Sequence, residues 1–369
     1  MSICVSGATG FLGAHVTRAL SERGDEVRVI YRDPDRLATL DGVRFRRAKT
    51  DVLDYRGMRR ALKDCKLLFH TAGFVGSTPT GRVWQINARA PVVVVEAAAA
   101  EGVPRVVVTS TVSAVGPAEG GRPADERRSY PDDWLGLTYA DSKHEGEEAA
   151  LEAGERHGVE VVIVNPAYVL GVPVNRSLPG ETSTRIVGNY LRGRLPGVVD
   201  APMNFVDVQD AAQGHLLAAD HGTPGERYIL GGDNLRWPEL IDRIARISGV
   251  HRPIMVVPPQ ITRLAHVREA LDIPGPMSAE GYELMAQDWR FSSRKAERDL
   301  GYRARPLEES LRDTIAWYQE LMEDGVFESE DSSTMATFAR GLGTASALGL
   351  LLPIRLGQRL TGRRVLAGI

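Results

Sequence analysis

Short apolar runs alternate with amphipathic stretches through the first half of the chain. The runs that predict strands cover residues 3–5, 26–31, 43–48, 66–71, 104–110 and 159–165. Helical spacing of apolar residues lies between them, most clearly over 82–101 and 138–156. This alternation predicts an α/β fold with a doubly wound parallel sheet and right-handed crossovers. Ligands bind such sheets beyond the carboxyl ends of the strands, so the residues after each strand are candidates for chemistry.

Three glycines at a spacing of three follow the first strand and open the first helix. Gly7 permits a tight turn, Gly10 lets the backbone approach a pyrophosphate, and Gly13 allows the helix to pack closely on the strand. The N–H groups and the positive end of the helix dipole can then hold phosphates. The alternative is a glycine-rich connector in another α/β protein. We favour a dinucleotide site that contains Gly7, Thr9, Gly10, Phe11, Leu12 and Gly13.

The end of the second strand bears on the choice of cofactor. Tyr31 stands where an acidic residue would bind a free ribose 2′-hydroxyl, and Arg32 follows it. A guanidinium suits a 2′-phosphate, which favours NADP over NAD. Alternatively, Arg32 is solvated and Asp33 binds the ribose. Farther along, the small side chain of Ala72 after the fourth strand leaves space for a flat cofactor.

Candidate catalytic groups follow the fifth strand and open a later helix. The hydroxyls of Ser110 and Thr111 lie where a substrate carbonyl would meet a nicotinamide. Tyr139 and Lys143 are four residues apart, so they share one face of a helix. A phenol titrates near 10 in water, and we expect the lysine ammonium and an oxidised nicotinamide to lower the pKa of Tyr139. Tyr139 could then exchange a proton with the substrate, and Lys143 could also bind the nicotinamide ribose.

Two other polar residues have less specific signals. His70 is expected to be a strand histidine with a satisfied hydrogen bond. Asn87, in the predicted helix 82–101, is either a surface residue or a buried organiser of a site.

The second half of the chain has a mixed pattern. We predict a Rossmann domain over residues 1–165 and a smaller, mixed substrate-binding region over 166–325 that is interwoven with it. The smaller region contains a proline- and glycine-rich loop at 168–179, a short strand at 228–230, and helices near 182–194, 238–248, 260–271 and 307–323. Asp207 and Asp210 are expected to cap the helix that they open.

Residues 326–369 predict a polar linker and a C-terminal amphipathic tail. The segment 345–354 is largely apolar, and four arginines follow it: Arg355, Arg359, Arg363 and Arg364. Such a tail could lie on a membrane surface, contact a partner subunit in a homodimer, or pack on the core of its own chain.

These motifs together resemble the extended short-chain dehydrogenases/reductases of the NAD-dependent epimerase/dehydratase superfamily. The resemblance covers roughly residues 1–320 and rests on the glycine loop, Tyr139 and Lys143, together with Asp51, His70-Thr71-Ala72, Asn87, Thr109-Ser110-Thr111 and Asn165-Pro166. The similarity is greatest to the dihydroflavonol-reductase and 3β-hydroxysteroid-dehydrogenase branch, near which proteins labelled hopanoid-associated sugar epimerases belong.

The resemblance implies roles for several residues. Asp51 would contact the adenine, with Val52, Ala72 and Pro166 also among the cofactor-binding residues. Asn87 would belong to the active-site network, and Tyr139 and Lys143 would be catalytic. The family usually has serine as the carbonyl-binding hydroxyl, whereas Thr111 occupies that position here, with Ser110 as the alternative.

Composition sets further bounds. The chain is 43% hydrophobic and 25% charged, as is typical of globular proteins, and its net charge of −3 gives no indication of a nucleic-acid partner. Cys4 and Cys65 are expected to be buried thiols rather than a disulfide or metal pair, which would indicate a reducing compartment. The first strand leaves no room for a signal peptide, and no apolar run is long enough for a membrane span. We therefore expect a cytoplasmic protein.

Three functions compete. The first is an NAD(P)-dependent reductase or dehydrogenase of a ketone or secondary alcohol in an apolar small molecule. The second is a sugar-nucleotide epimerase or dehydratase, and the third is a non-catalytic dinucleotide sensor, which the presence of Thr111, Tyr139 and Lys143 disfavours.

Met203 bears on the choice of substrate. In relatives that act on sugar nucleotides, an arginine typically stands at its position and would grip the diphosphate. Arg185, Arg192 and Arg194 could substitute for it. We favour an uncharged lipid-, terpenoid- or polyketide-like ketone in a pocket lined from 168–179, 182–194 and Met203.

Overall fold

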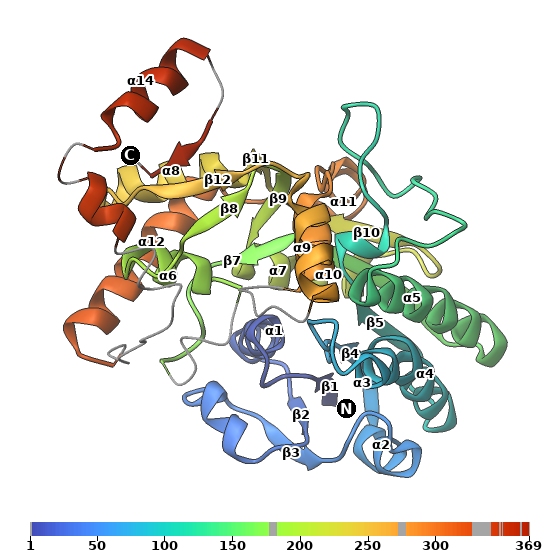
Figure 1. Cartoon of the computed structure of the whole chain (residues 1–369). Helices are drawn as coiled ribbons and strands as arrows, with labels where there is room; N and C mark the ends of the chain where they lie inside the picture. Colours follow the sequence, from blue (N-terminus) through green and yellow to red (C-terminus); the bar gives the residue numbers. More distant parts are fainter. Residues whose placement is uncertain are drawn as a thin grey trace.

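A seven-stranded parallel sheet forms the centre of the computed structural model (Figure 1). The structure describes residues 2–176, 183–271, 278–326, 341–346, 348, 350–361 and 364–368. Across the sheet the strands are β10 (Arg227–Leu230), β6 (Glu160–Pro166), β5 (Arg105–Thr109), β4 (Cys65–His70), β1 (Ser2–Ser6), β2 (Val27–Tyr31) and β3 (Arg46–Lys49). Every neighbouring pair runs parallel, which confirms the predicted doubly wound fold.

Helices cover both faces of this sheet. On one face, α1 (Phe11–Glu22) packs against α7 (Val208–His221). On the other, α4 (Ala90–Ala100) packs against both α2 (Tyr55–Leu62) and α5 (Thr138–His157). The central strands are valine-rich because both of their faces are buried. Since β10 and α7 come from the second half of the chain, that half returns to the main sheet.

The helix predicted over 82–101 has an interrupted form. It consists of α3 (Thr80–Trp84), a π-helical turn at Gln85–Arg89, and α4. Pro91 stands near the start of α4, where its ring cannot donate the regular hydrogen bond to the carbonyl of Asn87. A wider π turn accommodates this loss, and such turns are frequent at functional sites.

Two small mixed sheets lie apart from the main sheet, and all of their strands except one come from residues 166–325. One has the order β11 (Asp233–Arg236), β9 (Pro202–Asp207), β7 (Tyr168–Leu170), and the other has the order β13 (Leu366–Ala367), β12 (Ile254–Val257), β8 (Gly197–Val199). The helices around them are α6 (Arg185–Leu191), α8 (Trp237–Ser248), α9 (Ile261–Ala270), α10 (Ala279–Ala286) and α12 (Leu307–Glu323), whereas α11 (Arg294–Leu300) packs on α7 and β10 of the main sheet.

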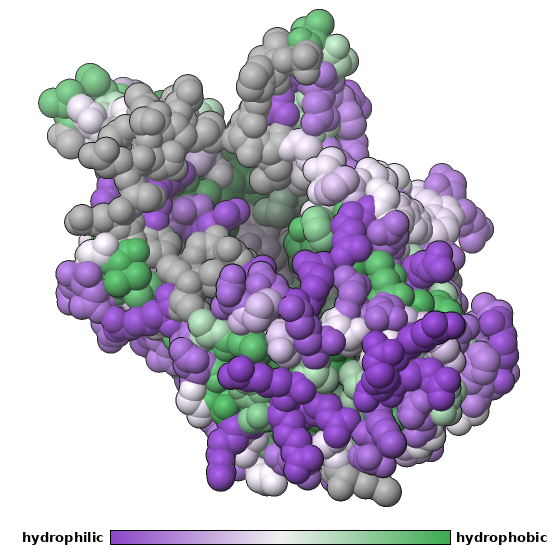
Figure 2. Space-filling view, turned by 90° about the horizontal axis from the view of Figure 1, so that it is seen from below, coloured by the Kyte–Doolittle hydropathy of each residue, from purple (hydrophilic) through white to green (hydrophobic). Residues whose placement is uncertain are grey.

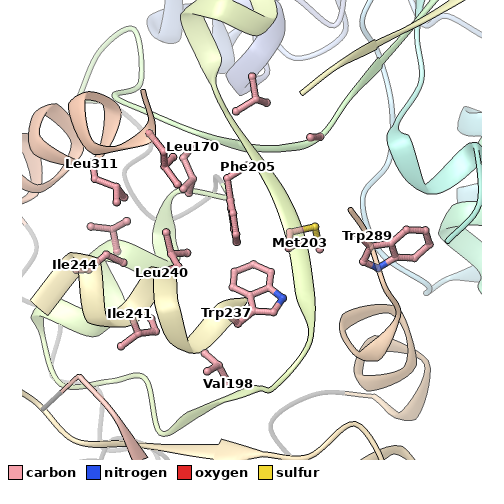
Figure 3. Packing of buried hydrophobic residues seen from close by; sticks show 14 of the residues in the cluster. Leu170, Val198, Met203, Phe205, Trp237, Leu240, Ile241, Ile244, Trp289 and Leu311 are labelled. Carbon is pink, nitrogen blue, oxygen red and sulfur yellow. The ribbon is translucent and has the colours of Figure 1, made fainter. Parts of the chain in front are cut away.

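Three aromatic side chains from β7, β9 and α8 pack against one another beside the small sheets. Trp237 lies edge-on to Phe205 and to Tyr168, with ring centroids 5.0 and 4.9 Å apart. Figure 3 shows Trp237 and Phe205 facing aliphatic side chains of α8, with Met203 on β9 between them and Trp289.

The C-terminal tail contributes a helix and a strand. Strand β13 pairs antiparallel with β12, and the backbone N–H of Gly368 donates to Asp242 on α8. Helix α14 (Leu352–Thr361) precedes this strand. Among the described residues, no helix combines the length and apolarity needed to cross a bilayer. Most of the predicted linker (327–340) and part of the predicted loop (177–182) lie outside the described residues.

The cysteines depart from expectation. Both are buried as predicted, but their sulfurs are bonded to each other, so the prediction of two free thiols is wrong. Adjacent parallel strands β1 and β4 carry them, with Cα atoms 6.4 Å apart. Residues 61 positions apart in sequence meet because β4 pairs directly with β1. The inference of a reducing compartment therefore loses its basis.

Candidate active site

The glycine turn lies between β1 and α1. Gly7 has a φ of +72°, and a Cβ there would stand 2.4 Å from the backbone nitrogen of Ala72. A Cβ on Gly13 would stand 2.2 Å from the Gly7 carbonyl oxygen. Any side chain would therefore disrupt the contact of α1 with β1 and β4. Gly10 is the exposed N-cap residue of α1, and no side chain caps the helix. The start of α1 thus fits the pyrophosphate of a dinucleotide.

Asp51 lies at the carboxyl end of β3 with two arginines beside it. Its Oδ2 is 3.7 Å from a guanidinium nitrogen of Arg32 and 3.4 Å from one of Arg82. Asp33 instead accepts a hydrogen bond from the backbone of Asp35, within its own turn. Arg82 was missed from the sequence because it lies 31 residues beyond Asp51 in a loop-to-helix segment without a motif.

Tyr139 and Lys143 meet the end of β5 from the first turns of α5. Tyr139 makes a side-chain hydrogen bond with Thr111. Lys143 is buried, and its Nζ donates to the carbonyl oxygen of Thr109 at 3.0 Å. A Cβ on Gly73 would stand 3.0 Å from that Nζ, so the absence of a side chain leaves space in front of the ammonium. The space is suited to a flat ring and its ribose.

The pKa of Tyr139 departs from the expected direction. Burial raises it, and the hydrogen bond with Thr111 only partly offsets this effect. Burial also lowers the pKa of Lys143 to about 8, against a raising effect from Glu147. The expected lowering of the Tyr139 pKa is therefore not a property of the free protein, in which desolvation dominates.

Of the two candidate hydroxyls, Thr111 faces Tyr139. It also caps a short 3₁₀ turn, accepting hydrogen bonds from the backbone and side chain of Ser113. Ser110 is buried and lies beside Glu147. The geometry therefore supports the choice of Thr111 over Ser110.

Asn87 is a buried organiser rather than a surface residue. It lies in the π-helical turn, and its amide exchanges two hydrogen bonds of 2.9 Å with the backbone of Phe74. The amide also donates to Ser142, next to Lys143, at 3.1 Å. Asn87 thus ties the loop after β4 to α5. A Cβ on Gly146 would stand 2.0 Å from the Asn87 carbonyl oxygen, so α5 approaches the π turn closely.

Buried His70 and Asp207 behave as expected, whereas Asp210 does not cap α7 and contacts Arg305 instead. Nδ1 of His70 lies 2.7 Å from the Ser6 hydroxyl, and burial lowers the pKa of His70 to about 3. Asp207 caps α7 by accepting a hydrogen bond from the Gln209 backbone at 2.7 Å. Asp210 accepts from the Arg305 backbone at 2.8 Å.

Glu280 and Met203 are two further residues that concern substrate binding and the position of Tyr139. Glu280 on α10 accepts hydrogen bonds from the backbone and hydroxyl of Thr138, directly before Tyr139. This contact was not predicted, because Glu280 lies 142 residues from Thr138 in the sequence. Met203, which we expected to line the substrate pocket, is buried in the core cluster (Figure 3). Figure 2 shows a largely hydrophilic face with a hollow near its upper centre, in which hydrophobic residues are visible.

The sequence of this chain is similar to one protein family and to several known proteins. Residues 3–231 match the NAD dependent epimerase/dehydratase family. A protein named as a dihydroflavonol 4-reductase from Synechocystis sp. is 31% identical over 327 residues, covering 85% of this chain and 94% of its own length. Sterol demethylase protein B of Methylococcus capsulatus is 31% identical over 330 residues, covering 87% and 99%.

A solved structure extends the similarity. The nucleoside-diphosphate-sugar epimerase from Pseudomonas aeruginosa has a TM-score of 0.73 at 26% identity, covering 89% of this chain and 99% of its own. The family match covers the glycine turn, Thr111, Tyr139 and Lys143. The two relatives align over 85% and 87% of this chain and over almost their whole length. The chain therefore belongs to the NAD-dependent epimerase/dehydratase family.

Proposed function

We propose that this protein is an NAD(P)-dependent reductase or dehydrogenase acting on a ketone or secondary alcohol of a mainly apolar small molecule. The observation that carries the proposal is the contact of Tyr139 with Thr111 at the end of β5, with buried Lys143 one turn away. A proton-transfer group, a carbonyl-orienting hydroxyl and a cation thus converge where a flat ring has room.

Each group has a proposed task. When bound, the nicotinamide cofactor supplies or accepts hydride. Thr111 orients the substrate oxygen by a hydrogen bond, and Tyr139 exchanges the proton at that oxygen. Because burial raises the pKa of Tyr139, the phenol is protonated at neutral pH and ready to donate to a ketone oxygen. Lys143 holds the nicotinamide ribose and favours the phenolate when the reaction runs toward oxidation.

The adenosine half of the cofactor would lie along the carboxyl ends of β1, β2 and β3. Gly7, Thr9, Gly10, Phe11, Leu12 and Gly13 would hold the pyrophosphate, and Asp51, Val52, Ala72 and Pro166 would line the rest of the cofactor. We favour NADP because Arg32 and Arg82 converge at Asp51, where a 2′-phosphate would find two guanidinium groups.

The alternative is a sugar-nucleotide epimerase or dehydratase. Met203, although buried, stands where a diphosphate-gripping arginine would be expected, so this position offers no cation to a diphosphate, which favours the apolar substrate. The names of the two reductase-type and sterol-related relatives point the same way, whereas the Pseudomonas epimerase favours the alternative. Calorimetric titration with UDP and with steroid- and flavonoid-type ketones decides between them. Micromolar UDP binding without affinity for the ketones would overturn our preference.

We also propose that the tail touches the surface of an anionic membrane. Leu352, Leu356 and Leu360 on α14 are 58%, 53% and 87% exposed and recur every four residues, so they form one apolar stripe. The segment 341–369 contains arginines but no acidic residue. Exposed leucines beside arginines are typical of helices that lie in a lipid interface.

Co-sedimentation with vesicles tests the membrane contact. Binding to vesicles rich in phosphatidylglycerol, with little binding to phosphatidylcholine alone, is expected. The double variant Leu356→Asp/Leu360→Asp should abolish it, while Tyr55→Asp, which alters an exposed residue on α2, should not. Equal binding by the double variant, or a salt-independent dimer through α14, would refute the membrane contact.

A further inference from the structure

Glu147 is a fully buried carboxylate on the helix face that carries the catalytic pair. It follows Lys143 by four residues, as Lys143 follows Tyr139, so the three side chains form one stripe along α5. The side chain of Glu147 has 0% exposed surface. Burying a carboxylate is costly unless charges and hydrogen bonds compensate, so its position calls for a physical explanation.

The contacts of Glu147 join α5 to two strands of the sheet, β6 and β10. Asn165 on β6 donates from Nδ2 to Glu147 and, at 2.9 Å, to the carbonyl oxygen of Thr111. Arg227 on β10 has a guanidinium nitrogen 3.5 Å from Oε2 of Glu147. Among the described residues, that oxygen has no hydrogen-bond partner. Burial raises the pKa of Glu147, whereas Arg227, Ser110 and Asn165 favour its charged form, and this carboxylate lies one helical turn from Lys143.

Several ionisable groups surround Glu147. Lys143, His144 and Glu148 lie on its own helix, Arg227 comes from β10, and Tyr130 from the loop before α5. Tyr139 shares the face of α5, and His70 on β4 faces Lys143. Arg227 also contacts Glu148 at 2.9 Å, but the Glu148 side chain is 56% exposed. Two neighbouring carboxylates therefore share one arginine, and only the buried one lies in the catalytic stripe.

We propose that Glu147 is a positioning residue that keeps buried Lys143 in its ammonium form on the Thr109 carbonyl. Burial lowers the pKa of Lys143 to about 8, and the Glu147 charge opposes that fall. Without this carboxylate, a larger fraction of Lys143 would be neutral near neutral pH. A neutral amine could not stabilise the Tyr139 phenolate. The catalytic consequence rests on the proposed function, whereas the effect on Lys143 does not.

A lysine titration by NMR tests the assignment in the free, full-length protein. The chain has five lysines, Lys49, Lys63, Lys66, Lys143 and Lys295, so biosynthetic labelling at Cε gives a simple spectrum. Lys143→Met identifies the signal. In the wild type we expect a midpoint near pH 8. In Glu147→Gln, which preserves the size of the side chain, we expect a midpoint lower by about one pH unit or more.

Glu148→Gln is the matched control, because it removes the exposed partner of the same arginine. Its Lys143 midpoint should equal that of the wild type. An unchanged midpoint in folded Glu147→Gln would overturn the proposal, as would an equal fall in both variants. If Glu147→Gln does not fold, Glu147→Asp keeps the charge but withdraws it by one methylene, and an unchanged midpoint there would also overturn it. The titration needs no substrate, so a lack of turnover would count against the proposed function alone.

Discussion

At the scale of single residues, the site depends on charges placed at strand ends. Arg32 is mostly exposed, and its guanidinium is held loosely by Asp51 at 3.7 Å. A cofactor phosphate could therefore recruit it at little cost, since exposed ion pairs contribute little free energy. Lys143 differs because it is buried and already bonded to a backbone carbonyl.

Replacing Arg32 should change cofactor preference. We expect Arg32→Ala to weaken NADP binding by about 1.5–3 kcal/mol, the range for a hydrogen bond to a charged group, and NAD binding far less. Arg82→Ala should have a similar but smaller effect. Fluorescence titration with NADPH and NADH measures both, with Arg56→Ala on α2 as an exposed control. If Arg32→Ala affected both cofactors equally, the case for NADP would be lost.

Lys143→Met should reduce cofactor affinity and turnover together. The methionine fills a similar volume but provides no ammonium for the ribose or the phenolate. Titration with the reduced cofactor and a steady-state assay report the two effects separately. A variant with normal cofactor affinity would show that Lys143 does not bind the ribose.

The sequence predicted the residues that lie in local motifs and missed those that tertiary contacts supply. Tyr139 and Lys143 share a helix face by spacing alone, and Gly7 follows from the strand-turn-helix pattern. Arg82 and Glu280 lack any local signal, because their roles arise from segments distant in sequence. The Cys4–Cys65 bond was missed for the same reason, since strand order brings the two residues together.

At the scale of elements, α5 is the part on which the site depends. Its own N-cap residue, Leu137, makes no side-chain cap, and Glu280 of α10 supplies acceptors to Thr138 instead. A carboxylate near a helix N-terminus also interacts favourably with the helix dipole. Helix α10 thus stabilises the turn that carries Tyr139.

Neutralising this cap should loosen the start of α5. We expect Glu280→Gln to lower the free energy of unfolding by about 0.5–1 kcal/mol, because one charged acceptor is lost at the helix terminus. Urea denaturation measures the loss, and amide exchange at Thr138 and Tyr139 localises it. Glu283→Gln is the control, because Glu283 on the same helix pairs with exposed His266. Identical exchange in both variants would remove the capping role.

The strand and helix pattern was predicted well where periodicity was strong, as for α5 and β6. Strand β3 begins at Arg46 rather than residue 43, because this edge strand is largely exposed and has little hydrophobic signal. The π turn at Gln85–Arg89 could not be predicted from apolar spacing. It depends on Pro91 and on the close approach of Gly146 to the Asn87 carbonyl.

At the scale of the whole molecule, burial of neutral histidines links stability to pH. The pKa of His70 is lowered to about 3, and those of His15 and His215 to about 4, with desolvation as the largest cause. A histidine whose folded pKa is depressed binds its proton mainly in the unfolded state as the pH falls below about 6.5. Each therefore destabilises the fold progressively under mild acid.

His70→Gln isolates one of these contributions. Between pH 7 and pH 5, we expect His70 to lower the free energy of unfolding of the wild type by about 2 kcal/mol. The variant lacks this histidine, so its free energy of unfolding should fall by that much less. Urea unfolding at the two pH values gives the difference, and His251→Gln provides an exposed control. The same pH dependence in wild type and His70→Gln would show that His70 does not titrate on unfolding.

The central claim is that Tyr139 transfers a proton during nicotinamide-dependent carbonyl reduction. The most direct measurement compares wild type and Tyr139→Phe for oxidation of the reduced cofactor, followed by absorbance across a panel of apolar ketones. We expect the wild type to reduce at least one ketone, and Tyr139→Phe to lose turnover while binding the reduced cofactor almost as tightly. Near-full turnover by Tyr139→Phe on such a ketone would contradict the account.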